Sequence, residues 1–285
     1  MPDLSAQLLL STNAVTIRDV ICRGEHRYKS SEEWSRTTHV VFPYRGVYVY
    51  HVGPHDAVAE ANQVVLFNAM ESYRVSHPVE GGDACLSITI GPELLRELAP
   101  RHQLREGDPP AFRRLHLRID PRAQVLVALL RYGLTRHAAE PLEAETLVFT
   151  LIRRALGERT SHVTRGTFGR QKLVDRTKLV LTSDMARRWT LAEIAAEVGV
   201  SPVYLTQVFA QVEAVPLYRY HLRLRLARAL DLLGQYDNLT ALSIDLGFSS
   251  HSHFSAAFRE AYGRSPSEFR QSFKSKAPEQ RPRQS

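Results

Sequence analysis

The sequence predicts a two-domain α+β protein, in which a strand-rich N-terminal half with a pair of helices precedes an all-α C-terminal half. Three observations predict this fold class. Short runs rich in Val, Phe and Tyr fill residues 15–90, helical periodicity follows in residues 121–157, and one helical segment near the C-terminus occurs twice. A chain of 285 residues is long enough for two domains.

The first half contains three strand-like runs, at residues 38–53, 62–78 and 83–91. Pro43 and Gly46 divide the first run into shorter pieces. Short β-branched and aromatic runs separated by Gly and Pro are typical of a small barrel or sandwich. Pro92 then begins a short helix at the position where proline is favoured.

Residues 121–157 have the apolar spacing of two antiparallel helices. Their apolar stripes are Val125, Leu126, Leu129 and Leu130 in the first helix, and Leu147, Val148, Leu151, Ile152 and Leu156 in the second. The pair could pack on its own barrel or against a second copy of the chain. We therefore predict a first domain at 1–157, a polar linker at 158–169, a second domain at 170–273, and a disordered tail at 274–285.

The repeated segment reads LAEIAAEVGVSPVYLTQVF at 191–209 and LTALSIDLGFSSHSHFSAAF at 239–258. Each copy consists of an apolar helix, a glycine turn and a second short helix. Gly199 and Gly247 stand where the turn needs a positive φ. This arrangement is typical of a helix-turn-helix unit, whose second helix fits the major groove of DNA. The predicted cores are Ile194, Val198, Leu205 and Phe209 in the first unit, and Leu242, Leu246, Phe254 and Phe258 in the second.

Cap and stop residues delimit the helices of this half. A lead helix is predicted at 170–189, a long helix after Pro216, and a last short helix after Pro266. The cap and stop positions are Thr190 with Glu193 as a capping box, Ser201 with Pro202, Thr240 as the cap of the second unit, and Gly263 as its end.

Several residues on each second helix are predicted to face outward. They are Val203, Tyr204, Thr206 and Gln207 in the first unit, and His251, Ser252, His253, Ser255 and Ala256 in the second. Gln can bond adenine, Ser and Thr can contact base or phosphate, and Val can touch a thymine methyl group. The alternative interpretation is an ordinary polar surface. If both units read one face of DNA, their separation is expected to be about 34 Å.

The long helix between the units carries Arg219, Arg223, Arg225 and Arg228. We expect some of them, Arg223 included, to contact DNA, and others to pair with Asp231 or Glu213. Residues 1–164 contain 19 Lys+Arg and 19 Asp+Glu, whereas residues 165–285 contain 18 and 11, so the whole net charge of +7 lies with the repeat. A basic half beside a neutral half favours a polyanionic partner, although a solubilising surface would have the same charge.

Residues 170–273 resemble the DNA-binding domain of AraC-type transcriptional regulators. The resemblance is strongest in LGFSSHSHFSAAFREAYGRSPSEFR, which is similar to the family signature. It implies a sequence-specific regulator that binds double-stranded promoter DNA, often an activator that contacts RNA polymerase. The chain departs from the family at Ala214, usually Gly, at Ser243, usually Ala, and at Ala256, often a basic residue.

The strand-rich half resembles the degenerate cupin-type sensor domain of the same family. The resemblance implies a small-molecule effector or a role in forming a homodimer, and no cofactor is expected. A candidate ligand pocket is lined by Phe42, Tyr48, Tyr50, Phe67 and Tyr73.

Two residue sets could hold a metal ion. Catalytic cupins use a His-x-His pair, a Glu and a later His, and the nearest match is His51, His55, Glu60 and His77, with unusual spacing. The second set is Cys22, His26, His77 and Cys85, which contains the atom types of a zinc site or a redox switch. The alternative for the second set is two buried thiols.

The preferred interpretation is a regulator without catalytic residues. The alternative is a metal-dependent cupin enzyme with an accessory DNA-binding module, and a DNA-packaging protein is a third class. No apolar stretch approaches the roughly 20 residues that span a membrane. The segment MPDLSAQLLL lacks the basic start of a signal peptide, and only two cysteines occur, so a cytoplasmic protein is expected.

Overall fold

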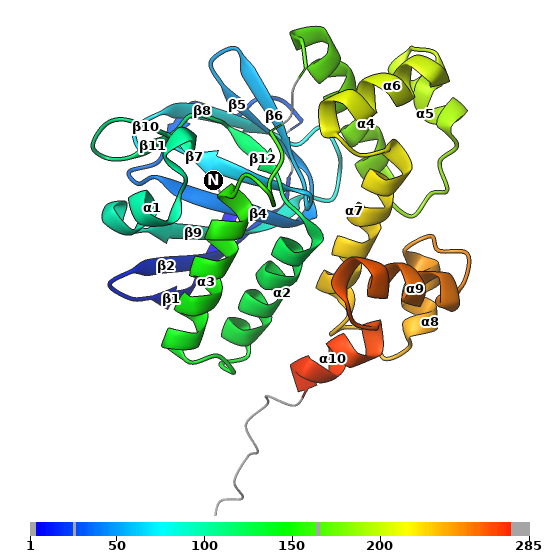
Figure 1. The fold of residues 1–285 in the computed structure, drawn as a ribbon. Coiled ribbons are helices and arrows are strands. Elements are labelled where there is room, and N and C mark those ends of the chain that lie inside the picture. Colours follow the sequence, from blue (N-terminus) through cyan, green and yellow to red (C-terminus); the bar gives the residue numbers. More distant parts are fainter. Residues whose placement is uncertain (1–3, 25–26, 164–165, 275–285) are drawn as a thin grey trace, which may run out of the picture.

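The N-terminal half of the protein is a curled antiparallel half-barrel, and the C-terminal half is entirely helical (Figure 1). This computed structural model describes residues 4–24, 27–163 and 166–274. The predicted fold class, a two-domain α+β protein with a cupin-like barrel and a helical C-terminal domain, is confirmed. The predicted disordered tail lies outside the described residues from 275 onward.

The larger sheet has six antiparallel strands in the order β1–β2–β9–β4–β7–β12. Its strands are β1 (Leu4–Ser11), β2 (Val15–Cys22), β4 (His39–Gly46), β7 (Gln63–Phe67), β9 (Asp83–Ile90) and β12 (His116–Arg118). Alternation along β4 sends Phe42 into a core shared with the helix pair, and Val41 into a second core on the concave side.

A second sheet closes over the first, with the order β3–β8–β5–β6. Its strands are β3 (Glu33–Trp34), β5 (Tyr48–Val52), β6 (His55–Ala59) and β8 (Ser72–Ser76). A short helix α1 (Pro92–Leu98), a single 3-10 turn (Arg101–Gln103) and a small ladder of β10 (Leu104–Arg105) with β11 (Ala111–Phe112) complete this half.

The helix pair packs on its own barrel. Helix α3 (Pro141–Leu156) contributes Val148 and Leu151 to the barrel core, and α2 (Pro121–Thr135) contributes Val127 and Leu130. The other side of α2 faces the C-terminal helices, where Ala128 joins their core. Helix α2 therefore lies between the two halves of the protein and packs against both of them.

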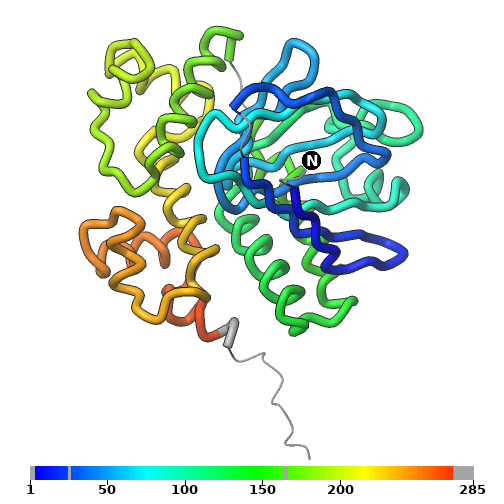
Figure 2. Tube along the Cα trace, turned by 180° about the vertical axis from the view of Figure 1, so that it is seen from behind, coloured from blue at the N-terminus to red at the C-terminus, as the bar shows by residue number. Residues whose placement is uncertain are grey.

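The C-terminal half forms two helical lobes joined by one long helix (Figures 1 and 2). The helices are α4 (Phe168–Ser183), α5 (Leu191–Val198), α6 (Pro202–Glu213), α7 (Leu217–Leu232), α8 (Leu239–Asp245), α9 (His251–Tyr262) and α10 (Pro266–Lys274). Both lobes lie along one side of the N-terminal half, and α7 runs between them. Among the helices that the structure describes, none combines the length and apolar character that a bilayer crossing requires.

Most of the predicted helix signals are confirmed. Thr190 and Glu193 form a complete capping box, and the Ser201 side chain caps α6. Gly199 and Gly247 have φ of 73° and 77°, as the turn requires.

Two predicted helix ends are wrong. The lead helix ends at Ser183 rather than at residue 189, because residues 184–190 form a loop in which the Trp189 indole donates to the Asp184 carbonyl at 3.0 Å. Helix α8 is capped by Asn238 and not by Thr240, because the Asn238 side chain accepts from the backbone N–H of Thr240 at 2.8 Å.

Candidate nucleic-acid interface

Each helix-turn-helix unit is held by a small apolar core. All eight predicted core residues are buried, with at most 4% of any of them exposed. The first set packs with α4 and α7, and the second set packs with α7 and α10. The buried Ser243 hydroxyl donates to the Thr240 carbonyl at 2.8 Å, so this departure from the family leaves no unpaired group.

The predicted outward face of α6 is open to solvent. Val203 is 68% exposed and Tyr204 is 45% exposed, and Thr206 and Gln207 are also exposed. An exposed Val beside an exposed Gln gives this helix the means for both a methyl contact and a hydrogen bond to a base edge.

The corresponding face of α9 is partly occupied by contacts within the helix. Ser252, His253 and Ala256 are exposed, whereas His251 and Ser255 are half-buried. The Ser255 hydroxyl lies 3.2 Å from Nε2 of His251. The two half-buried side chains thus already bond to each other.

The C-terminal ends of both second helices are held by the N-terminal half. The Val212 carbonyl of α6 lies 3.0 Å from the His162 imidazole, and the Glu213 carbonyl accepts from Arg118 at 3.1 Å. On α9, the Tyr262 hydroxyl donates to the Gln124 side chain at 3.1 Å. The N-terminal parts of both helices stay uncovered, and these are the parts that contact bases in helix-turn-helix proteins.

The arginines of α7 have different roles. Arg225 donates to the carbonyls of Met185, Arg187 and Gly247, so it joins the loop before the first unit to the turn of the second unit. Arg228 forms an ion pair with Asp231, one of the two acidic partners predicted for these arginines.

Arg223, one of the predicted DNA contacts, is half-buried in a pocket between α2, α7 and α9. Burial and the neighbouring Arg118 and Arg219 lower its pKa. Its role in DNA binding stays a prediction.

Sequence reasoning missed the polar groups that join the two halves. Arg131 of α2 lies 2.6 Å from the buried Asp231 carboxylate, and Arg118 of β12 lies 3.6 Å from the buried Glu213 carboxylate. The Tyr220 hydroxyl donates to Glu60 and accepts from Gln63 at 3.1 Å. These partners are about a hundred residues or more apart, and no short-range pattern signals them.

The residues that a catalytic cupin would use do not converge. The His51 imidazole bonds to Asp56 at 2.6 Å and to Ser76 at 2.9 Å. Glu60 accepts from Tyr220 at the junction of the two halves, and His55 is exposed at the start of β6. This arrangement offers no common ligand position for a cupin-type metal ion at these four residues.

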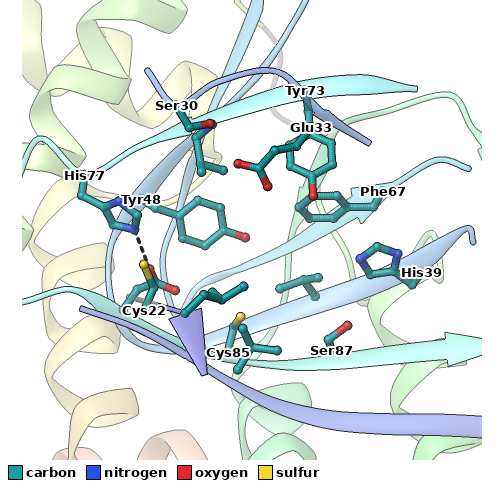
Figure 3. Close-up of a pocket in the computed structure, with 15 residues that line it drawn as sticks. Cys22, Ser30, Glu33, His39, Tyr48, Phe67, Tyr73, His77, Cys85 and Ser87 are labelled. Atoms are coloured by element: carbon teal, nitrogen blue, oxygen red, sulfur yellow. Dashed lines mark hydrogen bonds and ion pairs between the residues drawn. The ribbon is translucent and has the colours of Figure 1, made fainter. Parts of the chain in front are cut away.

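The concave side of the barrel contains a cavity of about 170 Å³ (Figure 3). Of the five predicted lining residues, Tyr48, Phe67 and Tyr73 line it. Phe42 does not line it, because it points to the opposite face of β4. Tyr50 does not line the cavity either; it packs against the lining residue Phe67, with the two ring centroids 4.3 Å apart.

The second predicted metal-binding set is brought together in part. Cys22 and His77 lie at one end of the cavity, where Asp83 joins them. Cys85 is buried further along β9, and His26 lies outside the described residues. Asp83 was missed by sequence reasoning, because only the pairing of β2 with β9 brings it to Cys22.

Comparisons with known proteins identify the helical half. Residues 194–272 match the family model described as a helix-turn-helix domain. The chain is 25% identical to the HTH-type transcriptional regulator GadX of Escherichia coli O127:H6 over 84% of both chains. It is 31% identical to the transcriptional activator AggR of Escherichia coli, over 35% of this chain and 38% of that protein.

Among solved structures, the chain is similar to a transcriptional regulator with an AraC-type DNA-binding domain from Chromobacterium violaceum. That likeness has 30% identity and a TM-score of 0.35, over 38% of this chain and 96% of the other.

The fold and the two exposed second helices define a transcriptional regulator with a paired helix-turn-helix domain. Residues 194–272 form an AraC-type helix-turn-helix domain, and the chain is similar to transcriptional regulators such as GadX and AggR.

Proposed function

We propose that the protein is a sequence-specific activator of transcription, which inserts the N-terminal parts of α6 and α9 into the major groove of promoter DNA. One observation carries this proposal: both second helices expose polar side chains at their N-terminal parts above buried apolar cores. The excess positive charge of residues 165–285 supports attraction to the phosphate backbone.

The barrel supports a role as the signal-receiving part. Its cavity of about 170 Å³, with Tyr48, Phe67 and Tyr73 in its wall, is mostly apolar but smaller than the roughly 300–1,000 Å³ of typical ligand pockets, so it suits only a small effector molecule. We assign residues 1–157 to this part, 158–169 to the linker and 170–273 to the DNA-binding part. We also propose that the protein contacts RNA polymerase, forms a homodimer and is located in the cytoplasm.

The experiment is a gel-shift competition. A bound sequence is first selected from random duplexes, and its complex with the full-length protein is then challenged with unrelated DNA. A specific regulator holds its site against about 10³-fold or more competitor. Equal competition by any duplex would contradict the proposal and favour a DNA-packaging role.

The alternative of a metal-dependent cupin enzyme has less support. It requires His51 and Glu60 as ligands, and both side chains are engaged by other residues. Glu60 also accepts from the backbone N–H of Asn62 at 2.7 Å, so its carboxylate is part of the junction between the two halves.

A further inference from the structure

We propose that Cys22, His77 and Asp83 bind one zinc ion at the end of the barrel cavity. This inference is independent of the proposed function. The ligand atoms of the three side chains all lie within 4.8 Å of one another. His77 and Asp83 are both buried, and Cys22 is half-buried.

Strand pairing places the thiol and the carboxylate opposite each other. In the antiparallel ladder of β2 and β9, Cys22 pairs directly with Asp83, so both side chains leave the same face of the sheet. His77 follows β8 and reaches this face from the side, as Figure 3 shows. Its Nε2 lies 2.8 Å from Oδ1 of Asp83.

Two glycines hold the backbone around this cluster. Gly24 and Gly82 have φ of 70° and 66°, a conformation that other residues rarely adopt. A Cβ on Gly82 would lie 2.2 Å from the Cys22 carbonyl oxygen, and a Cβ on Gly24 would lie 2.6 Å from the Gly82 Cα. The two segments therefore pack backbone against backbone, which fixes the strand ends that carry Cys22 and Asp83.

The donor set fits zinc better than other common ions. Zinc takes Cys sulfur at about 2.3 Å and His nitrogen or carboxylate oxygen at about 2.0–2.2 Å, in a tetrahedron. In such a site the donors are about 3–4 Å apart. The present spacing lies on both sides of this range: His77 Nε2 and Asp83 Oδ1, now hydrogen-bonded at 2.8 Å, would separate slightly, whereas all three donor atoms already lie within 4.8 Å of one another. Magnesium and calcium prefer oxygen ligands only.

Charge balance also favours a divalent ion. A thiolate and a carboxylate together carry two negative charges, which Zn²⁺ neutralises, so the loaded site adds no net charge to the buried interior. All three side chains line the cavity, so a fourth ligand would reach the ion from there. Water or a ligand atom of an effector can take this fourth position.

A disulfide between Cys22 and Cys85 explains the cluster less well than a zinc site does. Val20, and not Cys22, pairs with Cys85, so the two cysteines stand diagonally across the ladder. Diagonal neighbours are separated by about 7–8 Å, whereas disulfides usually need Cα atoms within about 4.4–6.8 Å. Oxidation would therefore require the strands to shift.

The test uses the full-length, reduced protein after removal of metal with a chelator. Titration with Zn²⁺ against a chromophoric competitor is expected to show one tight site per chain. Co²⁺ in the same site is expected to give visible absorption bands of tetrahedral geometry and a near-ultraviolet thiolate band. Cys22→Ala is expected to remove the thiolate band and to weaken zinc binding by at least about 100-fold, since even residues that only support a ligand often contribute 10–100-fold.

Cys85→Ala is the matched control, because Cys85 lies on the same face of β9 but outside the ligand set. It is expected to keep the stoichiometry and the cobalt spectrum. The wild-type cobalt spectrum tests the proposal without any variant. The proposal is overturned if the wild-type protein binds no zinc, if Cys22→Ala binds zinc as the wild type does, or if Cys85→Ala alone loses the thiolate band.

Discussion

Lys178 and Glu213 form an ion pair of 2.7 Å in which both side chains are completely buried. Lys178 belongs to α4 and Glu213 ends α6, so the pair joins the lead helix to the first reading helix. Burial alone would lower the pKa of Lys178, but attraction to Glu213 and neighbouring carboxylates outweighs it and raises the pKa. Arg118 of the barrel lies 3.6 Å from the same Glu213 carboxylate. One side chain thus connects two helices and the barrel.

Replacing Lys178 with methionine is expected to destabilise the protein strongly. The Lys178→Met change leaves the buried Glu213 carboxylate without its nearest cation, and breaking a buried pair in this way costs about 3–5 kcal/mol. Urea unfolding followed by circular dichroism measures the free energy of unfolding.

The double variant Lys178→Met/Glu213→Gln serves as the control. It removes both charges, so it is expected to be more stable than the single variant. Equal stability of the single variant and the wild type would show that the pair contributes nothing to the fold.

Asp175 is expected to make the stability depend on pH. Burial raises its pKa to about 6 from 3.8, against the opposing effects of Lys178 and of a hydrogen bond from Gln171. Because the folded state binds this proton more tightly, the contribution is fully present below about pH 4 and is lost as pH rises through about 6. Between pH 4 and 7 the free energy of unfolding of the wild type is expected to fall by up to about 3 kcal/mol because of Asp175. The Asp175→Asn variant is expected to lack this decrease. Denaturant unfolding at several pH values measures the difference.

Asp237→Asn is the control for this profile, because Asp237 is an exposed aspartate in the loop before α8. Its pH profile is expected to follow that of the wild type. A profile of Asp175→Asn that also matches the wild type would refute the assignment to Asp175.

Local signals explain why so much of the helical half could be predicted. The capping box joins Thr190 to Glu193, three residues away, and the core positions of each unit repeat with helical spacing. Such signals act within one helix or one turn. They are therefore visible in the sequence before any tertiary contact is known.

The rest depends on contacts between distant segments. The sequence shows an apolar stripe on α2 but not that Ala128 faces the C-terminal helices while Leu130 faces the barrel. Likewise, Cys22 and His77 were recognised as possible ligands, but Asp83 depends on the register between β2 and β9. Residue types alone do not determine a pairing register.

Replacing Ala214 with glycine is expected to stabilise the protein. Ala214 is exposed between α6 and α7 with φ of 52° and ψ of 25°, a left-handed conformation. That conformation costs a non-glycine residue about 1–2 kcal/mol, which the greater flexibility of unfolded glycine offsets by about 0.5–1 kcal/mol. The Ala214→Gly change should therefore add up to about 1 kcal/mol to the free energy of unfolding, measured in urea.

The matched control is Ala210→Gly, one turn earlier within α6. There the backbone is helical, and glycine is expected to destabilise by about 1 kcal/mol. If both substitutions destabilise the protein alike, the conformation at position 214 carries no strain.

Gln207 is expected to recognise one base pair. It is exposed on the N-terminal part of α6, and a glutamine there can bond adenine through both of its polar atoms. The Gln207→Ala change should cost about 1–3 kcal/mol in binding to the selected site and should relax the preference at one position. Binding measured against a panel of single-base variants of the site gives both quantities.

Gln211→Ala is the control, because Gln211 is the same residue type one turn further along α6. Its side chain accepts from Arg170 at 3.2 Å, and it lies near the end of the helix that the N-terminal half holds. It is expected to leave the base preference unchanged. If Gln207→Ala weakens binding equally on every duplex in the panel, Gln207 contacts phosphate and reads no base, because a phosphate contact carries no sequence information.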